Sequence, residues 1–87
     1  MIVLIPGLLR SYTGGVGRVE LPSTGTLGEA LAALDTRYPG MRFRIVDEQG
    51  AIRRHIKLFV DSELAPDLSV PVRSSRELMI VGALSGG

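Results

Sequence analysis

The stretch TLGEALAAL, residues 26–34, predicts the one long helix of this 87-residue chain. Thr26 and Glu29 match a T-x-x-E capping box, in which each side chain satisfies a backbone N–H group that would otherwise lack an acceptor at the helix start. Apolar residues recur at positions i, i+3, i+4 and i+7 and so form a single stripe: Leu27, Ala30, Leu31 and Leu34. The triplet YPG at 38–40 ends the helix, because proline restricts the residue before it and cannot continue the hydrogen-bond ladder.

Two strands are expected before this helix. Residues 1–6 are apolar at nearly every position and rich in β-branched side chains, which is typical of a central strand buried on both faces. The stretch TGGVG at 13–17 indicates a turn, and residues 18–21 then alternate polar with apolar. Together these segments predict an opening β-hairpin with a long, glycine-rich connection.

The second half of the chain predicts two more strands. Residues 41–46 are expected to add a short helical segment before a turn at 48–50. Residues 54–61 then alternate, so that one face, with Ile56, Leu58 and Val60, packs onto the helix. The other face of that strand would carry His55, Lys57, Phe59 and Asp61. Residues 64–72 hold two prolines and are expected to form an irregular connection, and residues 78–82 form a last apolar strand.

This order of elements predicts an α+β roll. One long helix is available for four strands, so a mixed sheet should pack a single main helix on one of its faces. A chain of 87 residues is expected to form one domain, residues 1–87, from which a flexible tail at 83–87 extends.

The composition excludes several classes of function. A formal net charge of +1 argues against an obligate nucleic-acid binder. The absence of cysteine excludes disulfides, zinc–thiolate sites and the storage of sulfur as a protein persulfide. The apolar N-terminus has no cationic leader and is too short to cross a bilayer, so we expect a cytoplasmic protein without a membrane partner.

A self-sufficient enzyme is not indicated. The glycines at 14, 15 and 17 fit neither a phosphate-binding loop nor a dinucleotide fingerprint and are better explained by a turn. His55 is the only histidine, and it lies in a basic run with Arg53, Arg54 and Lys57. A solvated strand face is favoured there over a catalytic base, and one histidine cannot assemble a metal site. No bound cofactor or metal is therefore expected.

The end of the chain offers a chemical group instead. A terminal pair such as Gly86–Gly87 arises by chance in about one sequence in two hundred. A carboxylate is a poor electrophile and must be activated, for instance as an acyl-adenylate, in another protein's narrow site. Glycines lack Cβ atoms and can thread such a site. A frayed end or a trimmed chain is the alternative interpretation.

A docking surface is expected beside this tail. Phe59 should face away from the core, and on the last strand Met79 and Val81 should face away from Leu78 and Ile80. An apolar patch of this kind suits a docking module, although such residues can also lie under a loop or be tolerated on a surface. The approach to the tail completes the expected contact surface: Ala83, Leu84 and Ser85.

The chain resembles the ThiS/MoaD family of ubiquitin-like, β-grasp sulfur carriers. The resemblance rests on the order and spacing of residues 26–31, 37–40, 53–56 and 59–61 and of the terminal glycines. It implies that an E1-like adenylyltransferase/sulfurtransferase activates Gly87 with ATP, after which sulfur replaces one oxygen to give a thiocarboxylate. The chain would then be a sulfur-donating co-substrate and not an enzyme.

The opening IPGLLRSYTGG, residues 5–15, is similar to the I-P-x-x-L-R-x-x-T-G-G opening of CysO-type carriers. That similarity implies a cysteine synthase-like acceptor and a metalloprotease that releases the new amino acid. The chain departs from the family at Asp61, where asparagine is usual, at the turn 74–76, and in the approach to the tail. Arg76 would reverse a charge beside the docking face.

Three alternative functions remain open at this point. A MoaD-like chain would be the small subunit of molybdopterin synthase and would donate sulfur to the large subunit. A protein modifier would join Gly87 to lysines of target proteins. A plain partner-binding subunit would use the sheet face without any tail chemistry.

Overall fold

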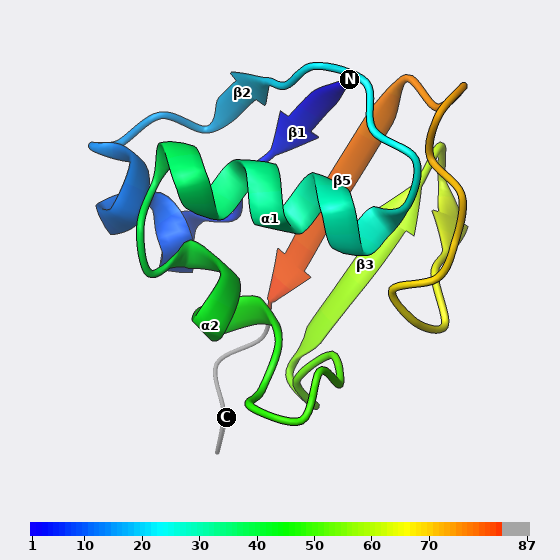
Figure 1. Ribbon diagram of the computed structural model, residues 1–87. Helices are drawn as coiled ribbons and strands as arrows, with labels where there is room; N and C mark the ends of the chain where they lie inside the picture. Colours follow the sequence, from blue (N-terminus) through cyan, green and yellow to red (C-terminus); the bar gives the residue numbers. More distant parts are fainter. Residues whose placement is uncertain (83–87) are drawn as a thin grey trace.

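Five strands form one mixed sheet, and helix α1 lies across one of its faces in the computed structural model, which describes residues 1–82 (Figure 1). The strands are β1 Ile2–Leu4, β2 Arg18–Glu20, β3 Ile56–Val60, β4 Glu63–Leu64 and β5 Glu77–Gly82. Their order across the sheet is β2-β1-β5-β3-β4, with β1 and β5 parallel and the other pairs antiparallel. The predicted α+β roll is confirmed.

Helix α1, Leu27–Arg37, begins where the sequence predicts. The Thr26 backbone N–H donates to Glu29 Oε1 at 2.9 Å, and the Glu29 N–H donates to Thr26 Oγ1 at 3.2 Å, so the capping box is complete. The four residues of the predicted apolar stripe are all buried. The short helix α2, Met41–Ile45, follows after Pro39-Gly40 and confirms the predicted second helical segment.

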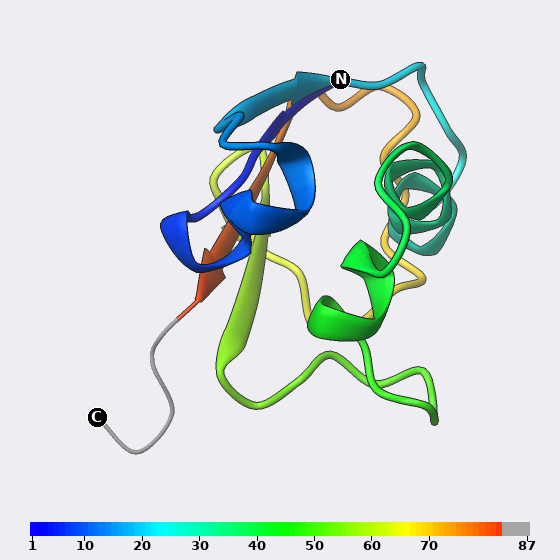
Figure 2. The same cartoon turned by 90° about the vertical axis from the view of Figure 1, so that its left-hand side faces the viewer.

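The core lies between the sheet and the two α-helices (Figure 2). On β3 the side chains of Ile56, Leu58 and Val60 are buried, as the alternation predicts. On β5 the buried side chains are Leu78 and Ile80. These two strands pair antiparallel along their whole length, from Ile56 opposite Gly82 to Val60 opposite Leu78.

Strand β1 is central but is not buried on both faces, so that prediction is wrong. Val3 is buried, while Ile2 and Leu4 are only half-buried. The described helices that cover the sheet lie on its inner face, so the outer side of β1 has no layer above it in residues 1–82. An unbroken apolar run does not distinguish this case from a fully covered strand.

The predicted opening hairpin is present, but a 3₁₀ helix forms most of its connection. This helix, η1, spans Gly7–Thr13, and Gly14 and Gly15 then turn the chain with φ of 68° and 93°. Thr13 belongs to the helix and not to the turn. Its hydroxyl is buried and donates to the Val16 carbonyl oxygen at 2.6 Å.

Strand β3 is shorter than predicted, and a strand that the sequence did not indicate follows it. Arg54 and His55 form a turn, so His55 does not lie on a strand face as predicted. Residues 61 and 62 close a two-residue hairpin with φ of 48° and 72°, which makes Leu64 part of β4 and not of an irregular connection. Asp61 tolerates this left-handed backbone, and its Oδ1 also accepts bonds from the N–H groups of Arg76 and Glu77, at 3.0 Å each.

Replacing Thr26 by alanine removes the capping bond, so Thr26→Ala should lower the free energy of unfolding by about 1 kcal/mol. Urea denaturation followed by circular dichroism measures the change. Thr36→Ala is the control, because Thr36 is an exposed residue inside the same helix. The control should change stability by no more than about 0.5 kcal/mol. Equal losses in both variants would contradict a specific role of the cap.

Candidate functional site

An apolar row crosses the outer face of the sheet, on the side away from α1. In register across four strands, Leu64 lies opposite Phe59, Phe59 opposite Met79, and Met79 opposite Leu4. Residues directly opposite one another share a face and contact through their side chains. We call these four residues the outer row. Leu64 is 56% exposed and the other three are half-buried, so the row is accessible from outside.

The structure places Phe59, Met79 and Val81 as the sequence predicts. Each faces away from the core, and Val81 is 39% exposed. The sequence analysis missed Leu4 and Leu64. Leu4 joins the row through the pairing of β1 with β5, which are more than 70 residues apart in sequence, and Leu64 joins it through the unexpected β4. The signal for Leu64 was available in the Asp61-Ser62 pair, which is typical of a tight turn.

The last described residue, Gly82, lies at the end of β5 and lines an apolar depression of about 260 Å³ that adjoins the outer row at Leu4 and Met79. Leu4, Pro6, Met79 and Val81 contribute to its lining. A Cβ atom on Gly82 would collide with Leu8 Cδ2 and would lie 3.3 Å from Ile56 Cδ1. A side chain at this position would therefore require Leu8 to move.

The remaining predicted site residues are Ala83, Leu84, Ser85, Gly86 and Gly87, and they lie outside the described residues. Strand β5 determines where they begin, because its final residue Gly82 pairs with Ile56 of β3. Arg76 lies at the other end of β5, beside the β3–β4 turn. Its charge is therefore at the far end of the strand from the tail.

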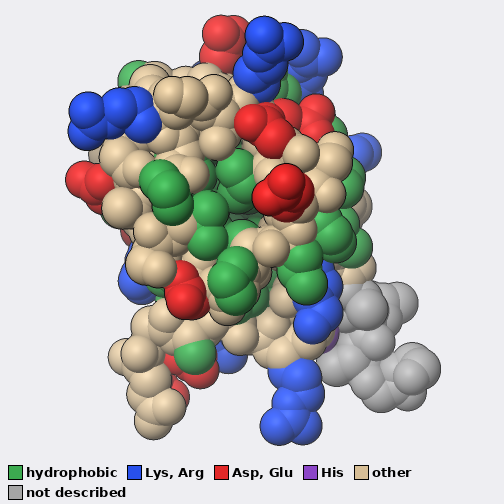
Figure 3. Space-filling model, turned by 90° about the vertical axis from the view of Figure 1, so that its right-hand side faces the viewer, with side chains coloured by type: hydrophobic (Ala, Val, Ile, Leu, Met, Phe, Trp, Pro, Cys, Tyr) green, Lys and Arg blue, Asp and Glu red, His purple; other side chains and the backbone are tan. Residues whose placement is uncertain are grey.

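A second depression, of about 440 Å³, lies at the end of β3 farthest from Gly82. Hydrophobic side chains gather on this side of the molecule, with acidic side chains around them (Figure 3). Asp61 and Glu63 belong to the lining, but Asp61 already holds the turn against β5. Within residues 1–82, no group of three or more histidine, cysteine or acidic side chains is arranged to hold a metal ion.

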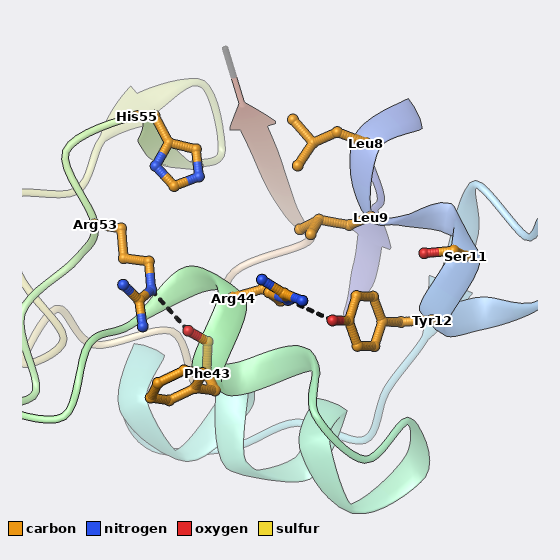
Figure 4. A pocket seen from close by; sticks show the side chains of 8 residues that line it. All are labelled: Leu8, Leu9, Ser11, Tyr12, Phe43, Arg44, Arg53 and His55. Carbon is orange, nitrogen blue, oxygen red and sulfur yellow. Dashed lines mark hydrogen bonds between the residues drawn. The ribbon is translucent and has the colours of Figure 1, made fainter. Parts of the chain in front are cut away.

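His55 lines a third depression, of about 370 Å³, with Ser11, Tyr12, Arg44 and Arg53 (Figure 4). Ser11 lies across this depression from His55, so the two side chains are not arranged as a nucleophile and its base. Among the described helices, none is both long and apolar enough to cross a membrane. Two of the three depressions lie beside Gly82, where the described part of the chain ends.

Comparison with known proteins identifies the family. The model of the ThiS family matches residues 3–87. This chain belongs to the ThiS family. A curated relative, the sulfur carrier protein CysO of Mycobacterium tuberculosis, is 30% identical over 90 residues, which cover 98% of this chain and 96% of the relative.

Solved structures agree with this ThiS-family assignment. A chain of the Amycolatopsis orientalis BexX/CysO complex superposes with a TM-score of 0.87 at 31% identity, covering 99% of this chain and 98% of that one. SAMP1 from Haloferax volcanii superposes with a TM-score of 0.76 at 28% identity, covering 100% and 98%. The ubiquitin-like β-grasp fold implied by the sequence is confirmed. The chain is a sulfur carrier protein, a role that is not catalytic in this family.

The side chains of β5 alternate between the core and the outer face, so substitutions at neighbouring positions should differ in their effect on stability. Ile80→Ala should cost about 2–5 kcal/mol of unfolding free energy, because it leaves a cavity in the core. Val81→Ala, at the next residue, should cost less than about 1 kcal/mol, because Val81 faces outward. Urea denaturation of both variants tests the assignment. A loss at Val81 as large as that at Ile80 would mean that the outer face is covered.

Proposed function

We propose that this carrier holds its sulfur as a thiocarboxylate on Gly87. The Gly87 carboxylate attacks the α-phosphate of ATP in an E1-like enzyme, which gives an acyl-adenylate and releases pyrophosphate. Sulfide supplied by a donor then attacks the acyl carbon, and AMP leaves, which gives the thiocarboxylate. The single observation that carries the proposal is that β5 ends at Gly82 in an apolar depression, so that only five residues separate the fold from the terminal carboxylate.

The absence of cysteine supports the same assignment. A carrier without a thiol cannot hold sulfur as a persulfide, and the terminal carboxylate is the group that remains. Gly86 and Gly87 also suit a narrow active site, since neither has a side chain that the site must accommodate.

The docking surface in this proposal is the outer row together with Val81. An exposed apolar surface next to a reactive terminus is a frequent interaction site. Ala83, Leu84 and Ser85 continue from it toward the carboxylate. Binding through the folded part raises the effective concentration of the tail at the partner's active site. The carrier then acts as a co-substrate of the enzymes that bind this surface.

We favour cysteine biosynthesis as the pathway and a cysteine synthase-like enzyme as the sulfur acceptor. The opening at residues 5–15 and the CysO relatives, which match nearly the full chain, support this choice. The large subunit of molybdopterin synthase is the alternative acceptor. The likeness to SAMP1, whose name describes a small archaeal modifier protein, supports protein modification as a second candidate function.

The decisive experiment follows the intact mass of the purified chain. Incubation with ATP, a sulfur donor and the host's E1-like enzyme should raise the mass by the difference between one sulfur and one oxygen atom. A variant that lacks Gly87 should show no change. An unchanged mass for the full chain, with an enzyme that loads another carrier, would refute the thiocarboxylate. Adducts on target lysines that are lost on deleting Gly87 would favour the modifier function.

The docking surface can be tested with Val81→Asp. Val81 lies directly opposite Lys57 on β3, so an introduced carboxylate has a cationic neighbour and the fold should tolerate it. The variant should raise the KM of the carrier for the E1-like enzyme at least about tenfold, which corresponds to about 1.4 kcal/mol of binding free energy.

Ala32→Asp is the control for this variant, since Ala32 is exposed on α1, on the other side of the molecule. It makes the same change of charge and should leave the KM unchanged. Similar values of KM for both variants would contradict docking through the outer face.

A further inference from the structure

The basic run at residues 53–57 lies beside the point where the tail leaves the fold. Ile56 pairs with Gly82 at the ends of β3 and β5. Leu8, which packs against Gly82, also forms one wall of the depression that contains Arg44, Arg53 and His55 (Figure 4). We call this depression the basic pocket. It lies on the α2 side of the sheet, at the end of β5 from which the tail continues, whereas the outer row lies on the other face.

Aromatic residues hold both arginines of the basic pocket in place. Arg53 Nε donates to the Phe43 carbonyl oxygen at 2.7 Å, and its guanidinium lies 4.6 Å from the centre of the Phe43 ring. Arg44 Nε donates to the Tyr12 hydroxyl, with the guanidinium 5.6 Å from that ring. A guanidinium has five N–H donors, so fixing it through Nε leaves its planar pair of terminal nitrogens for another acceptor.

The described lining of the basic pocket contains donors and apolar groups but no carboxylate. Asp47 is the acid whose charge interacts with Arg53, and it already accepts bonds from the Gln49 and Ala51 N–H groups at 2.9 and 3.0 Å. Those backbone bonds, more than Arg53, lower the pKa of Asp47. The carboxylate of Asp47 is thus hydrogen-bonded within the turn at residues 47–51 and does not line the basic pocket. The basic pocket therefore keeps the positive charges of Arg44 and Arg53.

Building on the proposed function, we propose that the basic pocket receives an aspartate or glutamate side chain of the enzyme that takes in the tail. The terminal nitrogens of each guanidinium present the forked donors that bind a carboxylate through two hydrogen bonds. Interfaces commonly surround an apolar centre with charged contacts that determine orientation and speed association. The outer row would supply the apolar contact, and the basic pocket would fix how the carrier is rotated about its tail.

A phosphate is a less suitable occupant because of distance. The nucleotide reacts at Gly87, and five extended residues span up to about 17 Å from Gly82. An acidic side chain at the entrance of the enzyme's channel would instead lie at the level of the pocket. The carrier's own terminal carboxylate is the remaining alternative, and the experiment below distinguishes it.

Zero-length carbodiimide crosslinking tests the proposal, because it joins an amine only to a carboxylate in direct contact. Lys57 is the one lysine of the chain, so Lys57→Arg provides a lysine-free background. In that background Arg44→Lys and Arg53→Lys each place a single amine in the basic pocket. Arg76→Lys, at the far end of β5, is the matched control. The probe is the E1-like enzyme that loads the unmodified carrier.

We expect crosslinks from position 44 or 53 to an acidic residue of the enzyme and none from position 76. The double variant Arg44→Gln, Arg53→Gln should raise the carrier's KM at least tenfold without changing kcat, and Arg76→Gln should leave both unchanged. A crosslink to the carrier's own C-terminus, equal crosslinking from position 76, or an unchanged KM would overturn the proposal while the carrier function stands. A wild-type carrier that acquires no sulfur would refute the carrier function itself.

Discussion

The pairing of β5 with strands on both of its sides is the constraint on which the rest of this structure depends. Its parallel pairing with β1 and its antiparallel pairing with β3 place the last strand in the middle of the sheet. Main-chain hydrogen bonds on both edges hold such a strand firmly in position. Residues 83–87 therefore continue from a strand that is paired on both sides.

One covered face is a further consequence of the chain's size. With α1 as the only long helix in the described chain, the inner face of the sheet is buried and its outer face keeps an apolar row. Burial of apolar surface contributes roughly 25 cal/mol for each Å² removed from water. A partner that covers the outer row would therefore gain binding free energy from its burial. The fold that holds the core together thus also creates the proposed docking surface.

In the proposed function, activation, sulfur transfer and release occur in other proteins, while the carrier positions its C-terminal segment. The apolar depression at Gly82 and the basic pocket lie at the same end of β5, and the outer row crosses the sheet at Met79, three residues before Gly82. Together they would determine where the tail enters a partner and in which rotation.

The sequence by itself determined the features that depend on neighbouring residues. The capping box at Thr26 and Glu29, the stripe of α1 and the alternation of β3 and β5 follow from periods of three to four or two residues. It also indicated the family and, through Gly86 and Gly87, the proposed reactive terminus. Only the tertiary structure decided which strands pair, because the pairing of β1 with β5 joins segments from opposite ends of the chain.

The same limit explains what the sequence analysis missed. The outer row needs Leu4 from β1 and Leu64 from β4, and the basic pocket combines η1, α2 and the turn before β3. Apart from the Asp61-Ser62 turn, which joins β4 to β3, none of these segments indicates its spatial neighbours by local pattern. Their proximity arises because burying the apolar stripe of α1 brings distant segments together, and that contact exists only in the folded chain.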